Sequence, residues 1–248
     1  MAGKKRADEL LFEKGLAESR EKAKRLIMAG QVYFRQSETD VLVDKPGRFL
    51  GKETGLRVKE APRFVSRGGY KLLTALDYFK IDIQDKVCLD VGASTGGFTD
   101  CLLQYKASRV YALDVGYGQL HWNLRSDPRV VNLEKINIRN APDDLLPEQV
   151  DIITIDCSFI PLFLVLHPAV NFLKPRGIVI ALVKPQFEVG PGMTVKGVVK
   201  SEQVALSAVQ AVIDKANDEL GLKCSGTVPS SIKGPKGNQE YLIYLHRT

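Results

Sequence analysis

Four charged residues near the ends of predicted elements have side chains that suit acid–base chemistry. Asp156 and Lys184 each close an apolar run, Lys71 lies upstream in Ser-Arg-Gly-Gly-Tyr-Lys, and Glu240 lies downstream in Gly-Asn-Gln-Glu. An unpaired charge at the end of a buried strand is costly, and a lysine in such a position readily changes its pKa. Such a lysine suits proton transfer or activation of a hydroxyl group. For Asp156 and Lys184 taken alone, a structural ion pair is an equally good explanation.

A glycine-rich turn, Asp90-Val-Gly-Ala-Ser-Thr-Gly-Gly-Phe98, follows the apolar run that begins at Val87. This pattern is typical of a buried parallel strand, a tight turn and a helix N-terminus, where backbone N–H groups face a ligand. The dinucleotide fingerprint requires glycine where Ser94 stands, and the phosphate loop requires lysine where Phe98 stands. S-adenosylmethionine needs no phosphate cradle, and we favour it over NAD and over a nucleoside triphosphate.

An acid at the end of the next strand would hold the ribose hydroxyls of that cofactor, and Asp114 stands at this place. A solvated carboxylate is the alternative explanation for Asp114. Near the end of the third strand, Glu134 or Asn137 is expected to contact the adenine. The candidate cofactor-binding residues are Asp90, Gly92, Ser94, Thr95, Gly96, Gly97, Phe98, Asp114 and Asn137.

The charge of the chain is unevenly distributed. Residues 1–71 hold 17 Lys and Arg against 10 Asp and Glu, or +7, whereas the other 177 residues hold 18 against 19, or −1. A basic N-terminal part suggests a module that binds a polyanion such as nucleic acid, although a solvated surface is the simpler explanation.

Several features place the chain among cytoplasmic proteins. Its four cysteines lack the spacing of a metal site, so we expect no metal and a reducing compartment. The N-terminus lacks the apolar core of a signal peptide. The longest apolar region, 152–173, contains Asp156, His167 and two prolines, so we expect no membrane segment.

The chain divides into a small first domain and a larger second one. Residues 1–60 form the first, with helices over 7–15 and 19–30 and short strands near 31–34, 41–43 and 56–58. Residues 61–64 are expected to form a linker, and 65–248 the second domain. Its expected strands lie near 87–91, 109–114, 129–133, 151–156, 177–184, 224–230 and 240–246. Strands that alternate with helices predict a doubly wound, mostly parallel α/β sheet, in which the last strand can insert antiparallel.

The first domain resembles the S4 RNA-binding domain. The resemblance rests on Ser19-Arg-x-x-Ala-x-x-Leu-Ile-x-x-Gly30, followed by a Val-x-Phe strand. It implies that the second helix and the following hairpin lie on structured RNA. Arg35-Gln-Ser stands where such domains often have an Asn-Gly turn. The candidate RNA-binding residues are Lys5, Arg6, Arg20, Lys24, Arg25 and, in the second domain, Arg67.

The second domain resembles the FtsJ-like methyltransferases. The glycine turn is similar to their first motif, and Lys71, Asp156, Lys184 and Glu240 match in order their Lys-Asp-Lys-Glu tetrad. With the S4-like part, the strings 65–69, 183–188 and 233–238 resemble the TlyA family over the whole chain. The resemblance implies a Rossmann-like sheet of seven strands and S-adenosylmethionine as cofactor. It also implies 2′-O-methylation of ribose, with cytidine as the target, in ribosomal RNA or ribosomal subunits.

The chemistry of a ribose hydroxyl, which is a poor nucleophile, suggests a role for each member of the tetrad. We expect Lys184 to contact the 2′-oxygen, Asp156 to hold this lysine, and Lys71 and Glu240 to complete the network and orient the ribose. The glycine-rich segment 188–197 is a candidate lid, or an ordinary loop. A ribosome-assembly factor with a vestigial fold is the alternative function. The haemolysin label that the family has carried is disfavoured, because no secretion signal or membrane-spanning pattern is seen.

Overall fold

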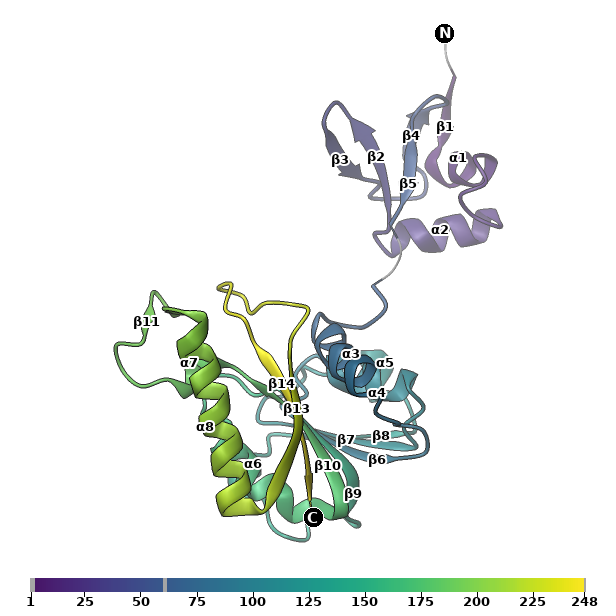
Figure 1. Ribbon diagram of the computed structural model, residues 1–248. Helices are drawn as coiled ribbons and strands as arrows, with labels where there is room; N and C mark the ends of the chain where they lie inside the picture. Colours follow the sequence, from purple (N-terminus) through teal and green to yellow (C-terminus); the bar gives the residue numbers. More distant parts are fainter. Residues whose placement is uncertain (1–2, 60–61, 248) are drawn as a thin grey trace. The chain divides into compact units, whose positions relative to one another are not determined.

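The computed structural model describes residues 3–59 and 62–247, which fall into two compact units, 1–63 and 64–248 (Figure 1). Of the expected linker 61–64, position 61 lies outside the described residues. Phe64, its last residue, is buried in the core of the second unit. No described helix is both long enough and apolar enough to cross a membrane.

The N-terminal unit is a small α+β fold, as expected. Helix α1 (Ala7–Glu13) and helix α2 (Arg20–Met28) pack against a sheet of strand order β3-β2-β5, which is accompanied by the pair β1–β4. The strands are β1 (Lys4–Arg6), β2 (Val32–Gln36), β3 (Thr39–Leu42), β4 (Phe49–Gly51) and β5 (Leu56–Val58). Ser19 caps α2 by accepting a hydrogen bond from the Lys22 amide at 3.1 Å. Strands β1 and β4 were not expected, because each spans three residues and their pairing crosses the whole unit.

The second unit is built on the expected seven-stranded sheet, in the order β13-β14-β10-β9-β6-β7-β8. The strands are β6 (Val87–Val91), β7 (Arg109–Asp114), β8 (Val130–Glu134), β9 (Val150–Ile155), β10 (Leu173–Val183), β13 (Leu222–Pro229) and β14 (Tyr241–Arg247). Strand β14 pairs antiparallel with both of its neighbours, and the remaining described pairings of this sheet are parallel. The prediction of a mostly parallel sheet with an antiparallel last strand is therefore confirmed.

Helices cover both faces of this sheet (Figure 1). Helices α3 (Gly68–Phe79), α4 (Gly97–Gln104) and α5 (Trp122–Arg125) pack on one face, and α6 (Phe163–Ala169) and α8 (Glu202–Leu220) pack on the other. Adjacent strand residues point to opposite faces. Cys88 therefore packs in the core under α3, α4 and α5, and Leu89 packs in the core under α6 and α8. Shorter elements are α7 (Pro185–Glu188), the 3-10 helices η1 (Ile138–Asn140) and η2 (Val170–Phe172), and a hairpin of β11 (Thr194–Val195) and β12 (Val198–Val199).

The strand register brings distant parts of the sequence to one edge of the sheet. Val91 of β6 lies opposite Ile155 of β9, so the residues after both strands leave the sheet together. Val183 of β10 lies opposite Tyr241 of β14. Because β14 runs antiparallel, the end of β10 and the start of β14 meet at this same edge. The glycine turn and the residues at positions 156, 184 and 240 are thereby gathered outside the carboxyl ends of the parallel strands.

Candidate active site

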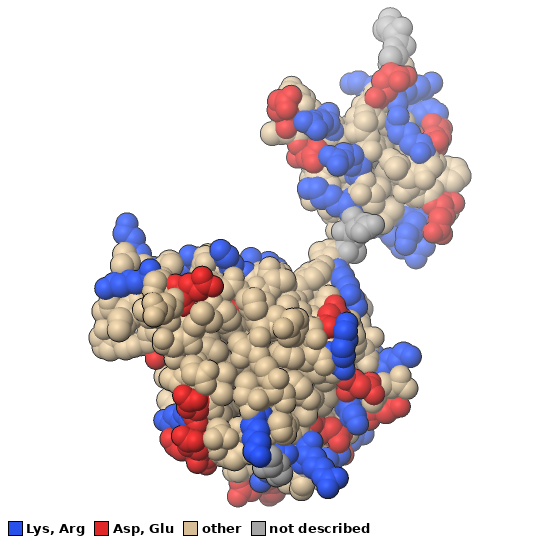
Figure 2. All heavy atoms as spheres, viewed as in Figure 1, with Lys and Arg blue, Asp and Glu red and all other residues tan. Residues whose placement is uncertain are grey.

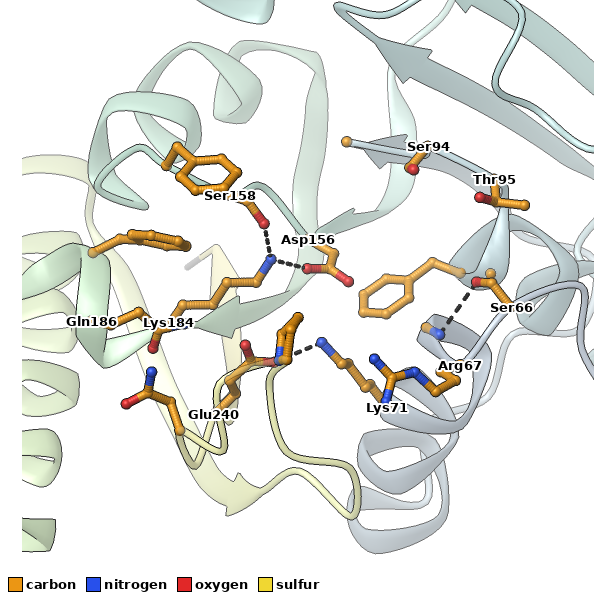
Figure 3. Close-up of a pocket in the computed structure, with 18 of the residues that line it drawn as sticks. Ser66, Arg67, Lys71, Ser94, Thr95, Asp156, Ser158, Lys184, Gln186 and Glu240 are labelled. Carbon is orange, nitrogen blue, oxygen red and sulfur yellow. Dashed lines mark hydrogen bonds and ion pairs between the residues drawn. The ribbon is translucent and has the colours of Figure 1, made fainter. Parts of the chain in front are cut away.

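A cavity of about 490 Å³ opens at this edge of the sheet. Ser94 and Thr95 of the glycine turn lie at one end of it and Lys184 and Gln186 at the other, with Asp156 between them in Figure 3. Its walls come from the glycine turn, the start of α3, the ends of β9 and β10, the tip of the β11–β12 hairpin and the segment before β14. The sequence-predicted residues that line it are Arg67, Lys71, Gly92, Ser94, Thr95, Gly97, Phe98, Asp156, Lys184 and Glu240.

Lys184 forms the centre of one polar group in the cavity. Its Nζ lies 2.6 Å from Asp156 Oδ1 as an ion pair and donates a hydrogen bond to Ser158 Oγ at 2.7 Å (Figure 3). The lysine side chain is only 6 % exposed. Asp156 Oδ1 is shielded from solvent, and its contact with Nζ does not have hydrogen-bond geometry, so this oxygen accepts no hydrogen bond from the described residues. The buried ammonium group of Lys184 is thus paired with a carboxylate, which offsets the cost of its burial, while Asp156 Oδ1 accepts no hydrogen bond from the described residues.

Lys71 and Glu240 form the second polar group. Lys71 Nζ donates a hydrogen bond to Glu240 Oε2 at 2.6 Å, across 169 residues of sequence. Glu240 is 1 % exposed and Lys71 is 12 % exposed, so the pair is held away from bulk water. All four members of the sequence-predicted tetrad therefore line one cavity, in two ion pairs.

The packing of α3 against α4 positions Lys71. A side chain at Gly97 would place its Cβ 2.3 Å from Ser66 Oγ and 2.8 Å from the Gly69 nitrogen, so only glycine allows this approach. The Val65 amide donates a hydrogen bond to Asp100 Oδ2 at 2.8 Å and ties the start of α3 to α4. Gly97, the third glycine of the turn, thus holds the helix that carries the lysine.

Asp90 lies beneath the glycine turn and does not line the cavity. It is fully buried, and its two oxygens accept hydrogen bonds from Thr99 Oγ1 at 2.7 Å and Thr154 Oγ1 at 3.0 Å. Burial raises its pKa to about 6, although the two hydroxyl groups act in the opposite direction. The structure therefore places Asp90 where it joins β6, α4 and β9.

Three other predicted cofactor residues also lie outside the cavity lining. Asp114 accepts hydrogen bonds from the amides of Ser94 at 2.8 Å and Gly116 at 2.7 Å, which fixes the turn to the end of β7. Gly96, at φ +96°, packs on Leu120 and Leu124. Asn137 caps η1 by accepting from the Arg139 amide at 3.1 Å. Glu134, the alternative to Asn137, is paired with Arg125.

The cavity fits the cofactor that the sequence suggests. Its volume lies in the range of small-molecule sites, and it combines polar and apolar lining as such sites do. At the turn end, Ser94 and Thr95 supply hydroxyl groups, Gly92 and Gly97 let the backbone approach, and Phe98 offers an aromatic face that is 3 % exposed. Among residues 3–59 and 62–247, no group of three or more His, Cys, Asp or Glu has the arrangement of a metal site.

Two of the predicted RNA-binding residues of the N-terminal unit, Arg6 and Arg20, contact a buried carboxylate. Asp8 accepts hydrogen bonds from Arg6 at 3.0 Å and from Arg20 at 3.2 Å, and these contacts hold the pKa of Asp8 below its usual range in spite of its burial. Lys5 pairs with Glu13, and Lys24 with Glu21 at 2.6 Å. Arg25 lies in the last turn of α2. Figure 2 shows basic side chains on the visible face of this unit, interspersed with acidic ones.

Sequence reasoning missed several residues of the cavity wall. They are Ser66, Ser158, Phe159, Gln186, Phe187, Lys236 and Asn238. Asn238 ties the β11–β12 hairpin to the segment before β14 through its side-chain amide. Its Nδ2 donates to the Gly197 carbonyl at 2.8 Å, and its Oδ1 accepts from the Val199 backbone amide at 2.9 Å. Proximity to Asp156, Lys184 and Glu240 in the sequence was the one signal that could have indicated most of these residues.

Comparison with known proteins agrees with this architecture. The FtsJ-like methyltransferase family matches residues 64–247, and the S4 domain family matches residues 5–33. The two matches agree with the seven-stranded sheet and the cavity at its carboxyl edge. The chain therefore belongs to the FtsJ-like methyltransferases and carries an N-terminal S4 domain.

The full-length relatives narrow the family. The 16S/23S rRNA (cytidine-2′-O)-methyltransferase TlyA of Mycobacterium tuberculosis is 43 % identical, over 99 % of this chain and 91 % of that protein. The candidate rRNA methyltransferase YqxC of Bacillus subtilis is 47 % identical, over 98 % of this chain and 86 % of that protein. A solved structure of a candidate hemolysin from Streptococcus thermophilus is 42 % identical, with a TM-score of 0.74 over 100 % of this chain and 90 % of that one. Within its class the chain is a member of the TlyA family.

Proposed function

We propose that this protein transfers a methyl group from S-adenosylmethionine to a ribose 2′-hydroxyl of ribosomal RNA, with cytidine as the target nucleotide. One observation carries the proposal: the ion pairs Lys184–Asp156 and Lys71–Glu240 line the same cavity as the glycine turn. The name of the mycobacterial relative supports the choice of RNA and of cytidine. An enzyme with this substrate works in the cytoplasm, where ribosomes are found.

The turn end of the cavity would hold the cofactor. Ser94, Thr95 and the backbone at Gly97 would contact its polar part, and Phe98 would cover an apolar face. Asp90 and Asp114 would act indirectly, since each fixes the shape of the turn through hydrogen bonds. When bound, S-adenosylmethionine supplies an electrophilic methyl group on a sulfonium.

The protein must then align the 2′-hydroxyl and manage its proton. A ribose hydroxyl is a weak nucleophile at neutral pH, so alignment and stabilisation of negative charge on the oxygen are the main demands. Lys184 Nζ would contact the 2′-oxygen and either accept its proton or donate a hydrogen bond as charge develops. Asp156 would hold the lysine, and the Lys71–Glu240 pair would fix the far wall against which the ribose rests.

The N-terminal unit would bring the RNA to this site. Its S4 match and the basic side chains on α2 support contacts with phosphate groups through Arg20, Lys24 and Arg25, with Lys5 and Arg6 beside them. In the second unit, Arg67 lines the cavity and would contact the RNA next to the target. Because the cavity is recessed, the target nucleotide would have to leave its stack to reach Lys184.

The test is transfer of labelled methyl groups to separated ribosomal subunits. The wild-type protein should label at least one subunit, and Lys184→Ala should lower the rate by about 100-fold or more while cofactor affinity is retained. Labelling of neither subunit nor intact ribosomes, with the cofactor bound, would favour the alternative of an RNA-binding assembly factor.

A further inference from the structure

We propose that Ser158 is a positioning residue for Lys184, and that it fixes the direction in which Nζ meets the substrate oxygen. This inference rests on the function proposed above and adds a fifth residue to the tetrad. Ser158 lies two positions after Asp156, in the loop that follows β9. Its hydroxyl oxygen lies 2.7 Å from Lys184 Nζ, and both residues line the cavity.

The contact with Ser158 is directional, whereas the contact with Asp156 is not. Of the two partners, Ser158 Oγ meets hydrogen-bond geometry, and Asp156 Oδ1 lies at 2.6 Å without it. A point charge attracts an ammonium group at any rotation about the Cε–Nζ bond. A hydrogen bond needs one N–H to point at the acceptor, so Ser158 is the partner that sets this rotation.

Fixing this rotation determines the directions in which the N–H groups and the lone pair of Nζ point in the cavity. A tetrahedral nitrogen has one bond to Cε and three other directions. When one of them is aimed at Ser158, the other two are determined. In the neutral amine, one N–H group donates to Ser158, and the lone pair occupies one of the two directions that this hydrogen bond fixes. We infer that this direction is the one along which the 2′-hydroxyl gives up its proton.

The loop that carries Ser158 is itself anchored. The Asp156 amide donates a hydrogen bond to the Val91 carbonyl at 3.1 Å, which ties the loop to β6. A Cβ on Gly92 would lie 2.9 Å from the Asp156 carbonyl oxygen, so the glycine turn packs directly on this loop. Phe159 then turns the chain in the left-handed region, at φ +64°. The hydroxyl of Ser158 is therefore held at a defined place between the turn and Lys184.

The first readout is a split between kcat and KM. Ser158→Ala should lower kcat by about 10- to 100-fold, the range that follows from a small misplacement of a reacting group. KM for ribosomal subunits and the affinity for S-adenosylmethionine should change little, because Ser158 is not needed to hold either ligand. Ser158→Thr keeps the hydroxyl group and should restore most of kcat.

The second readout is the dependence of kcat on pH. The Ser158 hydroxyl accepts a hydrogen bond from the ammonium group and so favours the protonated lysine. Its removal should move the pH of half-maximal kcat to a lower value. The other charged groups of the cavity are unchanged by the substitution; they are Arg67, Lys71, Asp156, Lys236 and Glu240.

The experiment compares Ser158→Ala, Ser158→Thr and the matched control Ser108→Ala, using the full chain, labelled cofactor and ribosomal subunits. The Ser108 hydroxyl donates hydrogen bonds to the backbone carbonyls of residues 85 and 86, and Ser108 does not line the cavity, so its variant should keep full activity. Unchanged kcat and pH profile in Ser158→Ala would overturn the inference while the proposed function stands. If alanine and threonine variants lose activity alike, without the pH shift, the inference also fails. Absence of transfer by the wild-type protein would instead contradict the proposed function.

Discussion

Lys71 and Glu240 form an ion pair of 2.6 Å, although one lies on the first helix of the second unit and the other immediately before its last strand. The pair closes the cavity wall that faces Lys184. It is buried from bulk water, and a buried pair costs more to break than it contributes when intact. Its position beside a reactive site suggests that it is kept for geometry more than for stability.

Removing one partner of this pair should therefore separate stability from activity. We expect Lys71→Met to lower the free energy of unfolding by about 3 kcal/mol, because it leaves the Glu240 carboxylate buried and unpaired. The double variant Lys71→Met/Glu240→Leu should regain much of that stability and remain inactive. Urea unfolding and methyl transfer measure the two quantities. A double variant with near wild-type transfer would contradict the role given to the pair.

The contact between α3 and the glycine turn should tolerate no side chain at Gly97. In Gly97→Ala the new methyl group would meet Ser66 Oγ and the Gly69 backbone, so either the turn or α3 must shift. We expect a loss of about 1–3 kcal/mol in unfolding free energy and weaker cofactor binding, measured by calorimetry. Gly55→Ala is the control, because nothing lies within 4 Å of its added Cβ. Equal behaviour of the two variants would show that the close approach is unimportant.

Asp90 should make stability depend on pH. Its pKa is raised to about 6, so the folded protein holds this proton more tightly than the unfolded chain does. The contribution of Asp90 to stability is then highest below about pH 4, falls as the pH rises towards 6, and stays lower by about 3 kcal/mol above it. Asp90→Asn should remove this slope. Urea unfolding between pH 4 and 7 tests it, and parallel curves for the two proteins would disprove it.

The N-terminal unit should bind RNA through phosphate contacts that depend on salt. Replacing Arg20 by Gln should weaken binding to ribosomal RNA at low salt and reduce the slope of log affinity against log salt by about 1. Asp44→Ala serves as a control, because it alters an exposed pair with Arg48 in the same unit. If Arg20→Gln leaves the slope unchanged, Arg20 serves its ion pairs with Asp8 and Glu9 and not the RNA.

The sequence predicted the parts of this fold whose signals are local. Strands β6, β9 and the second half of β10 are apolar runs, and the strand-end positions of Asp156 and Lys184 followed from them. The function of Asp90 could not be predicted in the same way. Its burial depends on Thr99 and Thr154, and the latter is 64 residues away. Ser158 carried no signal of its own, because its importance depends on where the Lys184 side chain ends.

The most direct test of the whole account is the identity of the methylated nucleoside. Ribosomal RNA is incubated with the protein and methyl-labelled S-adenosylmethionine, digested to nucleosides and separated by mass. The account predicts that the label appears in 2′-O-methylcytidine, and that Lys184→Ala lowers the rate of its appearance by about 100-fold or more without loss of RNA binding. Label on a nucleobase, or equal labelling by Lys184→Ala, would contradict it.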